Sequence, residues 1–260
     1  MTQTVLITGG SRGIGYATAE LFAQRGWNVA LCSRNEQQAK AAAEKIYNNV
    51  ILTPGLPRGK DLQKTADSSA TPQNDNPKIF GLKADVGNPH DVDDLFASVK
   101  KHFGALDALV NNAGILHTGN VFSLTDEQFD DMVRINLTGL ARCCRRAFEM
   151  MKISGGSIVN ISSIAGIQSA EKFSGLWAYT ATKSAVVGLS EALALEGKPY
   201  GIRVNCLAPG ATETEMLHKA APGLKADAQP EDIAKIAYYL CDKEQSGILS
   251  GSVIPVFSNG

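Results

Sequence analysis

A tyrosine and a lysine stand four positions apart in the stretch "YTATK", Tyr179 to Lys183, of an alanine-rich segment with a helical pattern. Residues at this spacing lie on one face of a helix, one turn apart. An ordinary tyrosine has a pKa near 10, too high for efficient proton transfer at neutral pH, and a neighbouring ammonium lowers it by favouring the phenolate. The pair could therefore donate and accept a proton. On its own, such a pair is more often a solvated helix face.

A second stretch whose residues could serve a chemical function is "TGGSRGIG", in which Gly9, Gly13 and Gly15 separate an apolar strand from a helix. Glycine permits a tight turn and lets the backbone approach a pyrophosphate, and the helix N-terminus adds free N–H groups. The turn therefore predicts a dinucleotide site, although a plain glycine-rich turn is the alternative. Its spacing is Gly-x-x-x-Gly-x-Gly, which differs from the commoner Gly-x-Gly-x-x-Gly.

The elements that must position these residues alternate along the chain. The sequence predicts strands within 4–8, 28–33, 78–86, 108–114, 156–162, 202–210 and 252–257. It predicts helices that include 15–26, 36–46, 91–104 and 178–197. Several strands are apolar without alternation, as in sheets covered on both faces. We therefore expect one α/β domain over residues 1–260, a Rossmann-type, doubly wound parallel sheet of seven strands with helices on both faces.

Composition narrows the classes of function. The 260 residues are 44% hydrophobic and 20% charged, with a formal net charge of -1, which gives no electrostatic reason to expect nucleic acid or an anionic membrane as partner. No apolar run approaches the roughly 18 residues of a membrane span. The five cysteines are odd in number and lack metal-ligand spacing, so we expect no metal and a reducing, cytoplasmic setting. The opening "MTQTVLITGG" predicts no secretory leader.

One segment breaks the alternation of strands and helices. Residues 48–78 are rich in Pro, Asn, Asp, Ser and Gly and lack sustained periodicity, which predicts an exposed or disordered insertion. The segment follows a helix and precedes a strand, so it belongs at the amino-terminal edge of the sheet. Ligands of such sheets bind at the opposite edge. We therefore expect the insertion to be dispensable for chemistry.

Six motifs occur in the order typical of one enzyme superfamily. They are "TGGSRGIG", "NNAG" (111–114), "INLTG" with Asn136, "NISS" ending at Ser163, "YTATK" and "VNCLAPG". In this order and over nearly the whole chain outside the insertion, they resemble the short-chain dehydrogenase/reductases. The nearest resemblance is to 3-oxoacyl-[acyl-carrier-protein] reductases and related NADPH-dependent carbonyl reductases.

The resemblance implies a catalytic tetrad of Asn136, Ser163, Tyr179 and Lys183. Ser163 would bond the substrate carbonyl, or the alkoxide that it becomes, and help place it against the hydride. Lys183, together with oxidised nicotinamide, would lower the pKa of Tyr179, and it would also bond the nicotinamide ribose. Asn136 would hold a water in the proton relay to Lys183.

The resemblance also implies which residues contact the cofactor. They are Gly9, Ser11, Arg12, Gly13, Ile14, Gly15, Ser33, Arg34, Asp85, Val86, Asn112, Ala113, Gly114, Ile161, Tyr179, Lys183, Pro209, Gly210, Thr212 and Thr214.

The residues after the second strand predict the kind of nicotinamide cofactor. NAD enzymes carry an acid about 20 residues beyond the glycines, whereas this chain has Ser33-Arg34-Asn35. Arg34 could bind a 2′-phosphate, and Arg12 could add a second charge from the glycine turn. Glu36 is the rival signal for NAD(H), but it better suits the first turn of the next helix. We therefore expect NADP(H).

Two departures from the family pattern bear on the substrate. The interval from Ser163 to Tyr179 is 179 − 163 = 16 positions, a few more than most of the family shows. The extra residues should border the substrate pocket, with Gln168, Phe173 and Trp177 shaping it, although Trp177 could equally belong to the core. The segment between "PGATETEM" and "QPEDIAK" is short for the family's mobile lid, which predicts a more open site.

The leading hypothesis is NADPH-dependent reduction of a ketone, either a 3-oxoacyl thioester or a related small carbonyl compound. The first alternative is oxidation of a secondary alcohol of the sugar or steroid type. A non-catalytic NADP-binding scaffold is the second, because a fold alone does not determine function. The resemblance further implies a homo-oligomer, a tetramer, with a small-molecule substrate as the partner.

Overall fold

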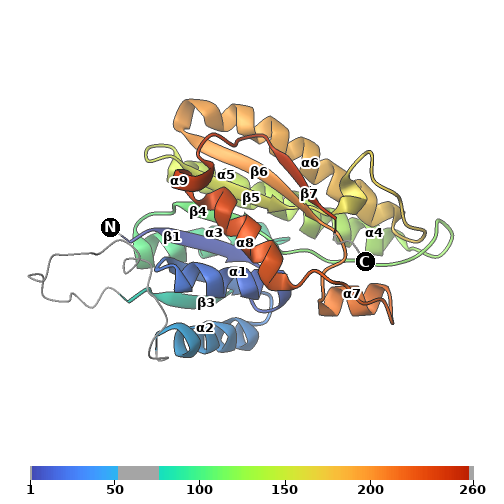
Figure 1. Ribbon diagram of the computed structural model, residues 1–260, viewed down its shortest axis with the longest axis horizontal. Coiled ribbons are helices and arrows are strands. Elements are labelled where there is room, and N and C mark those ends of the chain that lie inside the picture. The colour runs from blue at the N-terminus through green and yellow to red at the C-terminus, as the bar shows by residue number, and fades with distance from the viewer. Residues whose placement is uncertain (1, 52–75, 258–260) are drawn as a thin grey trace, which may run out of the picture.

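The computed structural model describes residues 2–51 and 76–257. They form one sheet of seven parallel strands in the order β3-β2-β1-β4-β5-β6-β7, with helices on both faces (Figure 1), which confirms the predicted doubly wound fold. The strands are β1 (Thr4–Thr8), β2 (Asn28–Ser33), β3 (Ile79–Lys83), β4 (Ala108–Asn111), β5 (Gly156–Ile161), β6 (Ile202–Pro209) and β7 (Val253–Val256).

Most of the α-helices pack in two layers, one on each face of the sheet. Their bounds are α1 (Gly13–Gln24), α2 (Glu36–Ile51), α3 (Pro89–Phe103), α4 (Asp126–Met132), α5 (Leu140–Met151), α6 (Trp177–Gly197), α7 (Glu215–Ala220), α8 (Pro230–Cys241) and α9 (Lys243–Ser246). A π-helix, Val133–Gly139, joins α4 to α5, and short 3₁₀ turns cover Ile164–Gly166 and Lys198–Tyr200.

The strands supply two cores because successive side chains point to opposite faces. Val5 and Ile7 of β1 belong to a core with α1, α2 and α8, whereas Leu6 between them belongs to a core with α3, α5 and α6. All five residues of β1 are buried. This double burial explains why the central strands are apolar without alternation.

The predicted insertion begins later than the sequence indicated. Residues 48–51 continue α2, so the expected boundary at Asn48 was wrong by four residues, and residues 52–75 lie outside the described part of the chain. The chain rejoins the sheet at Lys78, whose carbonyl accepts from Val29 N at 2.8 Å beside the start of β3.

The strand order places a ligand crevice between β1 and β4. These strands lie side by side, with Thr8 opposite Asn111 at their carboxyl ends, although they are not consecutive in sequence. The chain leaves β1 towards one side of the sheet and β4 towards the other, and ligands of open α/β sheets bind at such a point. Helices α4 and α7 lie beyond this end of the sheet (Figure 1).

Two features are absent from the described residues. No helix of this part of the chain is long and apolar enough to cross a membrane. Within the same residues, no three His, Cys, Asp or Glu side chains are grouped so that they could hold a metal ion.

Candidate active site

The glycine turn after β1 packs tightly against the segment after β4. Gly9 has a φ of 65°, and a Cβ added to it would lie 2.9 Å from the Ala113 Cα. A Cβ on Gly15 would lie 2.3 Å from the Gly9 carbonyl oxygen. The Thr8 hydroxyl fixes the contact by accepting from Asn112 N at 3.1 Å and Ala113 N at 3.0 Å. These glycines are therefore required for the close approach of the two segments.

The N-terminus of α1 offers donors for an anion. Arg12 occupies the N-cap position without a capping hydrogen bond from its side chain, and the first turn contains no acidic residue. The first N–H groups of a helix have no partner within it, and the helix dipole favours an anion there. Ser11 lies in the same turn, and Ile14 lies in the first turn of α1. This donor set fits a dinucleotide pyrophosphate.

The four predicted catalytic residues converge from separate elements. The Lys183 Nζ lies 5.6 Å from the centroid of the Tyr179 ring, and the Tyr179 hydroxyl forms a hydrogen bond with Ser163. A Cβ built on Gly114 would lie 3.3 Å from the Asn136 Oδ1 and 3.7 Å from the Lys183 Nζ. The π-helix, the turn after β5 and α6 thus bring the tetrad residues together beside the segment that follows β4.

Asn136 lies within the π-helix and is buried there. Its Oδ1 accepts from Ile115 N at 2.8 Å, and its Nδ2 donates to the Ile115 carbonyl at 2.9 Å. The same Nδ2 donates to the Thr182 hydroxyl at 3.3 Å. The side chain therefore braces the segment after β4 against α6. π-bulges are frequent at functional sites.

Lys183 is buried, with only 4% of its surface exposed. Its ammonium donates to the Ile161 carbonyl at 2.9 Å, and burial lowers its pKa to about 8. The Ser162 hydroxyl donates to the Lys183 carbonyl at 2.8 Å, which ties α6 to the end of β5. A lysine with a pKa near 8 exchanges protons readily close to neutral pH.

The pKa of Tyr179 departs from the sequence expectation. Burial raises it to about 12, and the hydrogen bond with Ser163 opposes this rise. Among the described residues, burial outweighs every group that lowers this pKa, and Lys183 does not offset it. Tyr179 therefore holds its proton across the neutral range, which suits an acid that donates to a newly formed alkoxide.

The residues expected at the adenosine end are more exposed. Arg34 is exposed, and no hydrogen bond or ion pair involves it within the described part of the chain. Asn35 accepts from Gln38 N at 3.0 Å and so begins α2, and the Ser33 hydroxyl accepts from Asn35 N at 3.3 Å. Glu36 pairs with Lys40 at 2.6 Å, one turn further along α2. Glu36, the residue that would favour NAD(H), is thus engaged in an ion pair within α2.

Asp85 and Val86 have structural partners. The Asp85 carboxylate accepts from Gly87 N at 2.9 Å and from Arg134 at 3.1 Å. Val86 is buried, and its carbonyl oxygen would lie 2.8 Å from a Cβ on Gly139 in the π-helix. Both residues therefore hold the end of β3 against the π-helix.

The comparisons with known proteins agree with this geometry. The family model described as short chain dehydrogenase matches residues 3–71 and 58–225. An "Uncharacterized oxidoreductase YgfF" of Escherichia coli is 36% identical over 96% of both chains. The 3-oxoacyl-[acyl-carrier-protein] reductase FabG of Chlamydia muridarum is 31% identical over 98% of this chain and 96% of its own. The chain belongs to the short-chain dehydrogenase family.

A solved member of this family supports the fold. A short-chain type dehydrogenase/reductase from Mycobacterium marinum superposes with a TM-score of 0.79 at 26% identity, covering 98% of this chain and 93% of that one. The chain is thus an oxidoreductase of the short-chain dehydrogenase family, with relatives close to the FabG reductases.

Within this short-chain dehydrogenase, the three residues expected to shape the substrate pocket are exposed. Gln168 is exposed, and Phe173 is 46% exposed. Trp177 begins α6 and stacks on Phe129 of α4, with the ring centroids 5.5 Å apart and the rings inclined by 15°. With 42% of its surface exposed, Trp177 is not a core residue. The Gly119 N–H donates to the Gly175 carbonyl at 3.0 Å, which joins the extra loop to the loop before α4.

The predicted lid lies between Met216 and Gln229; we use the name lid for the longer segment 210–229, which contains α7. It leaves β6 at Pro209, where the Gly210 N–H donates to the Val256 carbonyl at 2.8 Å. Thr212 is buried and donates to the Gly210 carbonyl at 3.2 Å. Thr214 caps α7 by accepting from Leu217 N at 3.3 Å. A Cβ on Gly13 would lie 3.4 Å from the Thr214 Cγ2, so the lid begins directly against the glycine turn.

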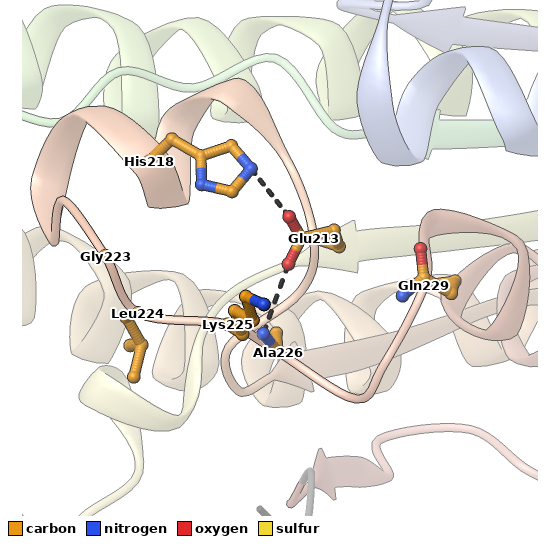
Figure 2. Close-up of a pocket in the computed structure, with 7 residues that line it drawn as sticks. All are labelled: Glu213, His218, Gly223, Leu224, Lys225, Ala226 and Gln229. Carbon is orange, nitrogen blue, oxygen red and sulfur yellow. Dashed lines mark hydrogen bonds and ion pairs between the residues drawn. The ribbon is translucent and has the colours of Figure 1, made fainter.

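A cavity of about 400 Å³ lies inside this lid (Figure 2). Its lining residues are Glu213, His218, Gly223, Leu224, Lys225, Ala226 and Gln229. Figure 2 shows the Glu213 carboxylate between the two sides of the lid, where it contacts His218 Nε2 at 2.6 Å and Ala226 N at 3.1 Å. The lining includes no tetrad residue.

The sequence analysis missed several residues that build the site. Thr8 was not singled out, although a threonine directly before the glycine turn is a visible signal. A buried set beneath the site was also missed: Asn111 donates to Asn160 at 2.9 Å and to the Cys144 sulfur at 3.2 Å, and Asn160 donates to Ser190 at 2.9 Å. Glu215 was missed because its partner, Arg12, is 203 positions away.

Proposed function

We propose that this short-chain dehydrogenase reduces a ketone to a secondary alcohol with NADPH, and that the ketone is a 3-oxoacyl thioester or a related small carbonyl compound. The observation that carries the proposal is the convergence of Ser163, Tyr179, Lys183 and Asn136 at the carboxyl edge of the sheet. Relatives named 3-oxoacyl-[acyl-carrier-protein] reductase support the acyl thioester as the substrate class.

The described residues fit an NADP(H) molecule. The glycine turn and the uncapped N-terminus of α1 would hold the pyrophosphate. Arg34 is exposed and unpaired among the described residues, so its guanidinium is free to bind a 2′-phosphate, with Arg12 as a second charge. A reduced nicotinamide supplies a hydride when it is bound.

The tetrad residues would handle the oxygen and its proton. Ser163 would donate a hydrogen bond to the carbonyl oxygen and orient the carbonyl carbon for attack. The Tyr179 hydroxyl would give its proton to the carbonyl oxygen as that oxygen becomes an alkoxide. Lys183, with a pKa of about 8, would return a proton to the phenolate from the side of Asn136. Residues that stabilise the developing charge would contribute the most to the rate.

We also propose a homotetramer in the cytoplasm. The resemblance to the family supports the tetramer. The five cysteines, which are all free and buried, support a reducing compartment. Analytical ultracentrifugation would test the assembly.

The experiment that tests the activity is NADPH consumption by the purified protein against a panel of carbonyl compounds. The panel contains acetoacetyl thioesters, sugars, quinones and steroids. Oxidation of the corresponding alcohols with NADP+ measures the reverse reaction. We expect turnover with at least one thioester or small ketone. Inactivity throughout the panel, with NADPH still bound, would favour a non-catalytic NADP-binding scaffold.

A further inference from the structure

An ion pair joins the glycine turn to the lid. The Arg12 Nη1 lies 2.6 Å from the Glu215 Oε2, and the two side chains are 60% and 62% exposed. Arg12 is the N-cap residue of α1, and Glu215 is the first residue of α7. The contact therefore joins the N-terminus of α1, where the cofactor pyrophosphate is proposed to bind, to the start of α7.

The lid presents Glu215 in a defined position. Thr214, the preceding residue, caps α7 and also donates to the Thr212 carbonyl at 3.1 Å. Glu213 binds both His218 and Ala226 N, which closes the lid upon itself (Figure 2). The Thr214 methyl group lies against Gly13, as the short distance to a built Cβ shows. The pairing with Arg12 thus follows from the packing of the lid on the glycine turn.

Arg12 and Arg34 differ in whether an acidic side chain already pairs with the guanidinium. Arg34 has no ion-pair partner within the described residues, whereas Arg12 is paired with a carboxylate at hydrogen-bond distance. A phosphate dianion placed on Arg12 would lie next to that carboxylate, and like charges at contact repel. Binding of a 2′-phosphate at Arg12 would therefore require Glu215 to move away.

We propose that Glu215 is a positioning residue that sets cofactor selectivity by competing with the 2′-phosphate for Arg12. The inference rests on the proposed function, because it assumes that Arg12 is a ligand of that phosphate. The carboxylate weakens the binding of phosphorylated dinucleotides and leaves NAD(H) nearly unaffected. Release of Glu215 also frees the first residue of α7, so phosphate binding loosens the lid from the glycine turn.

The test measures ligand binding by calorimetry, with no catalytic step. The probes are 2′,5′-ADP and 5′-ADP, which differ in the 2′-phosphate, and then NADPH and NADH. Glu215→Gln keeps the shape of the side chain and removes its charge. We expect it to tighten 2′,5′-ADP and NADPH by about twofold to fivefold, the range typical of an exposed ion pair, with little change for 5′-ADP and NADH. Glu215→Asp should stay closer to the wild type.

Two controls separate competition at Arg12 from other effects. Glu213→Gln removes the same charge two positions away without touching Arg12, and it should leave the ratio of the two affinities nearly unchanged. In an Arg12→Ala background, Glu215→Gln should lose its effect on that ratio, because the residue through which it acts is gone.

The inference is overturned if Glu215→Gln leaves the affinity ratio unchanged or lowers it. It is also overturned if the gain in affinity for 2′,5′-ADP persists in the Arg12→Ala background. That result would indicate that the Glu215 carboxylate repels the phosphate directly and does not act through Arg12. A failure of the proposed NADP(H) site looks different: the wild type would bind 5′-ADP as tightly as 2′,5′-ADP, and neither Arg12→Ala nor Arg34→Asp would alter the ratio.

Discussion

Lys183 is 4% exposed and donates to a backbone carbonyl, whereas the Arg12 side chain is 60% exposed and pairs with a single carboxylate of the lid. In the proposed cofactor site, the first would lie at the nicotinamide end and the second at the adenosine end. At the buried end, burial decides the protonation of Tyr179 and Lys183. At the exposed end, the charges stay fixed and solvent screens their interactions.

This difference implies a division of labour between the two ends. Burial strongly changes the pKa values of acids and bases, so the residues at the buried end can transfer protons. Exposed arginines can contact a phosphate although they are not part of the hydrophobic core, so the residues at the exposed end can select between NADPH and NADH. Substitutions at the buried end should affect the rate most, and those at the exposed end should affect selectivity.

The largest effect is expected at Tyr179. Tyr179→Phe removes the proton donor without a change in helix packing, so kcat should fall by about a hundredfold or more. The Kd for NADPH should change by less than about twofold. Steady-state kinetics and calorimetry measure the two quantities, and Tyr200→Phe in the 3₁₀ turn after α6 is the matched control. Retention of more than about a tenth of the wild-type rate would show that Tyr179 is not the general acid.

Arg34 should dominate the choice of cofactor. Arg34→Asp removes a charge-assisted contact with the 2′-phosphate, so NADPH binding should weaken by about tenfold to a hundredfold, while NADH binding should change much less. Arg34→Lys keeps the charge and should retain much of the preference for NADPH. If the wild type instead prefers NADH, the ribose ligand must be sought elsewhere, first at Glu36.

Burial of Lys183 should be visible in the pH dependence of stability. Its pKa falls from the ordinary 10.5 to about 8, so between these values the folded state binds fewer protons than the unfolded state. The contribution of Lys183 to the free energy of unfolding should therefore rise with pH, by ~2 kcal/mol from about pH 8 to 10, and it opposes the fall expected from the buried cysteines, whose pKa values burial raises. Lys183→Met lacks this contribution, and urea unfolding of both proteins measures the difference. Parallel pH profiles would show that Lys183 is not buried as described.

The smallest effect is expected from the insertion. A short Gly/Ser turn in place of residues 52–75 would connect the end of α2 to the described chain that enters the sheet at Lys78, beside the start of β3. The kinetic constants should stay within about twofold, because ligands of this kind of sheet bind at the opposite edge. A folded deletion with the same oligomeric state and a large loss of turnover would place the segment near the active site.

Local pattern was sufficient to predict most of the fold. The glycine turn, the apolar strands and the order of the motifs gave the seven-stranded sheet, because each depends on residues close in sequence. Helix α4 was missed even though Thr125 and Gln128 form a capping box, a signal that is visible in the sequence. The start of the insertion was placed too early, because the two asparagines at 48 and 49 share the polar composition of the insertion and yet continue α2.

The candidate site was predicted less completely, for physical reasons. Which residues meet at the tetrad came from resemblance, but the pKa of Tyr179 depends on burial, which only the packed structure reveals. Arg12 was expected to be free for a phosphate, yet it meets Glu215 across 203 positions. Such contacts depend on how the lid packs, and no local spacing encodes them.

The division of labour is tested most directly by kcat/KM with NADPH and NADH, measured for the wild type, Tyr179→Phe and Arg34→Asp on one substrate. The account predicts that Tyr179→Phe lowers both values by the same large factor and leaves their ratio unchanged. Arg34→Asp should lower the NADPH value by about tenfold or more and spare NADH. An equal loss with both cofactors in Arg34→Asp, or a changed ratio in Tyr179→Phe, would contradict it.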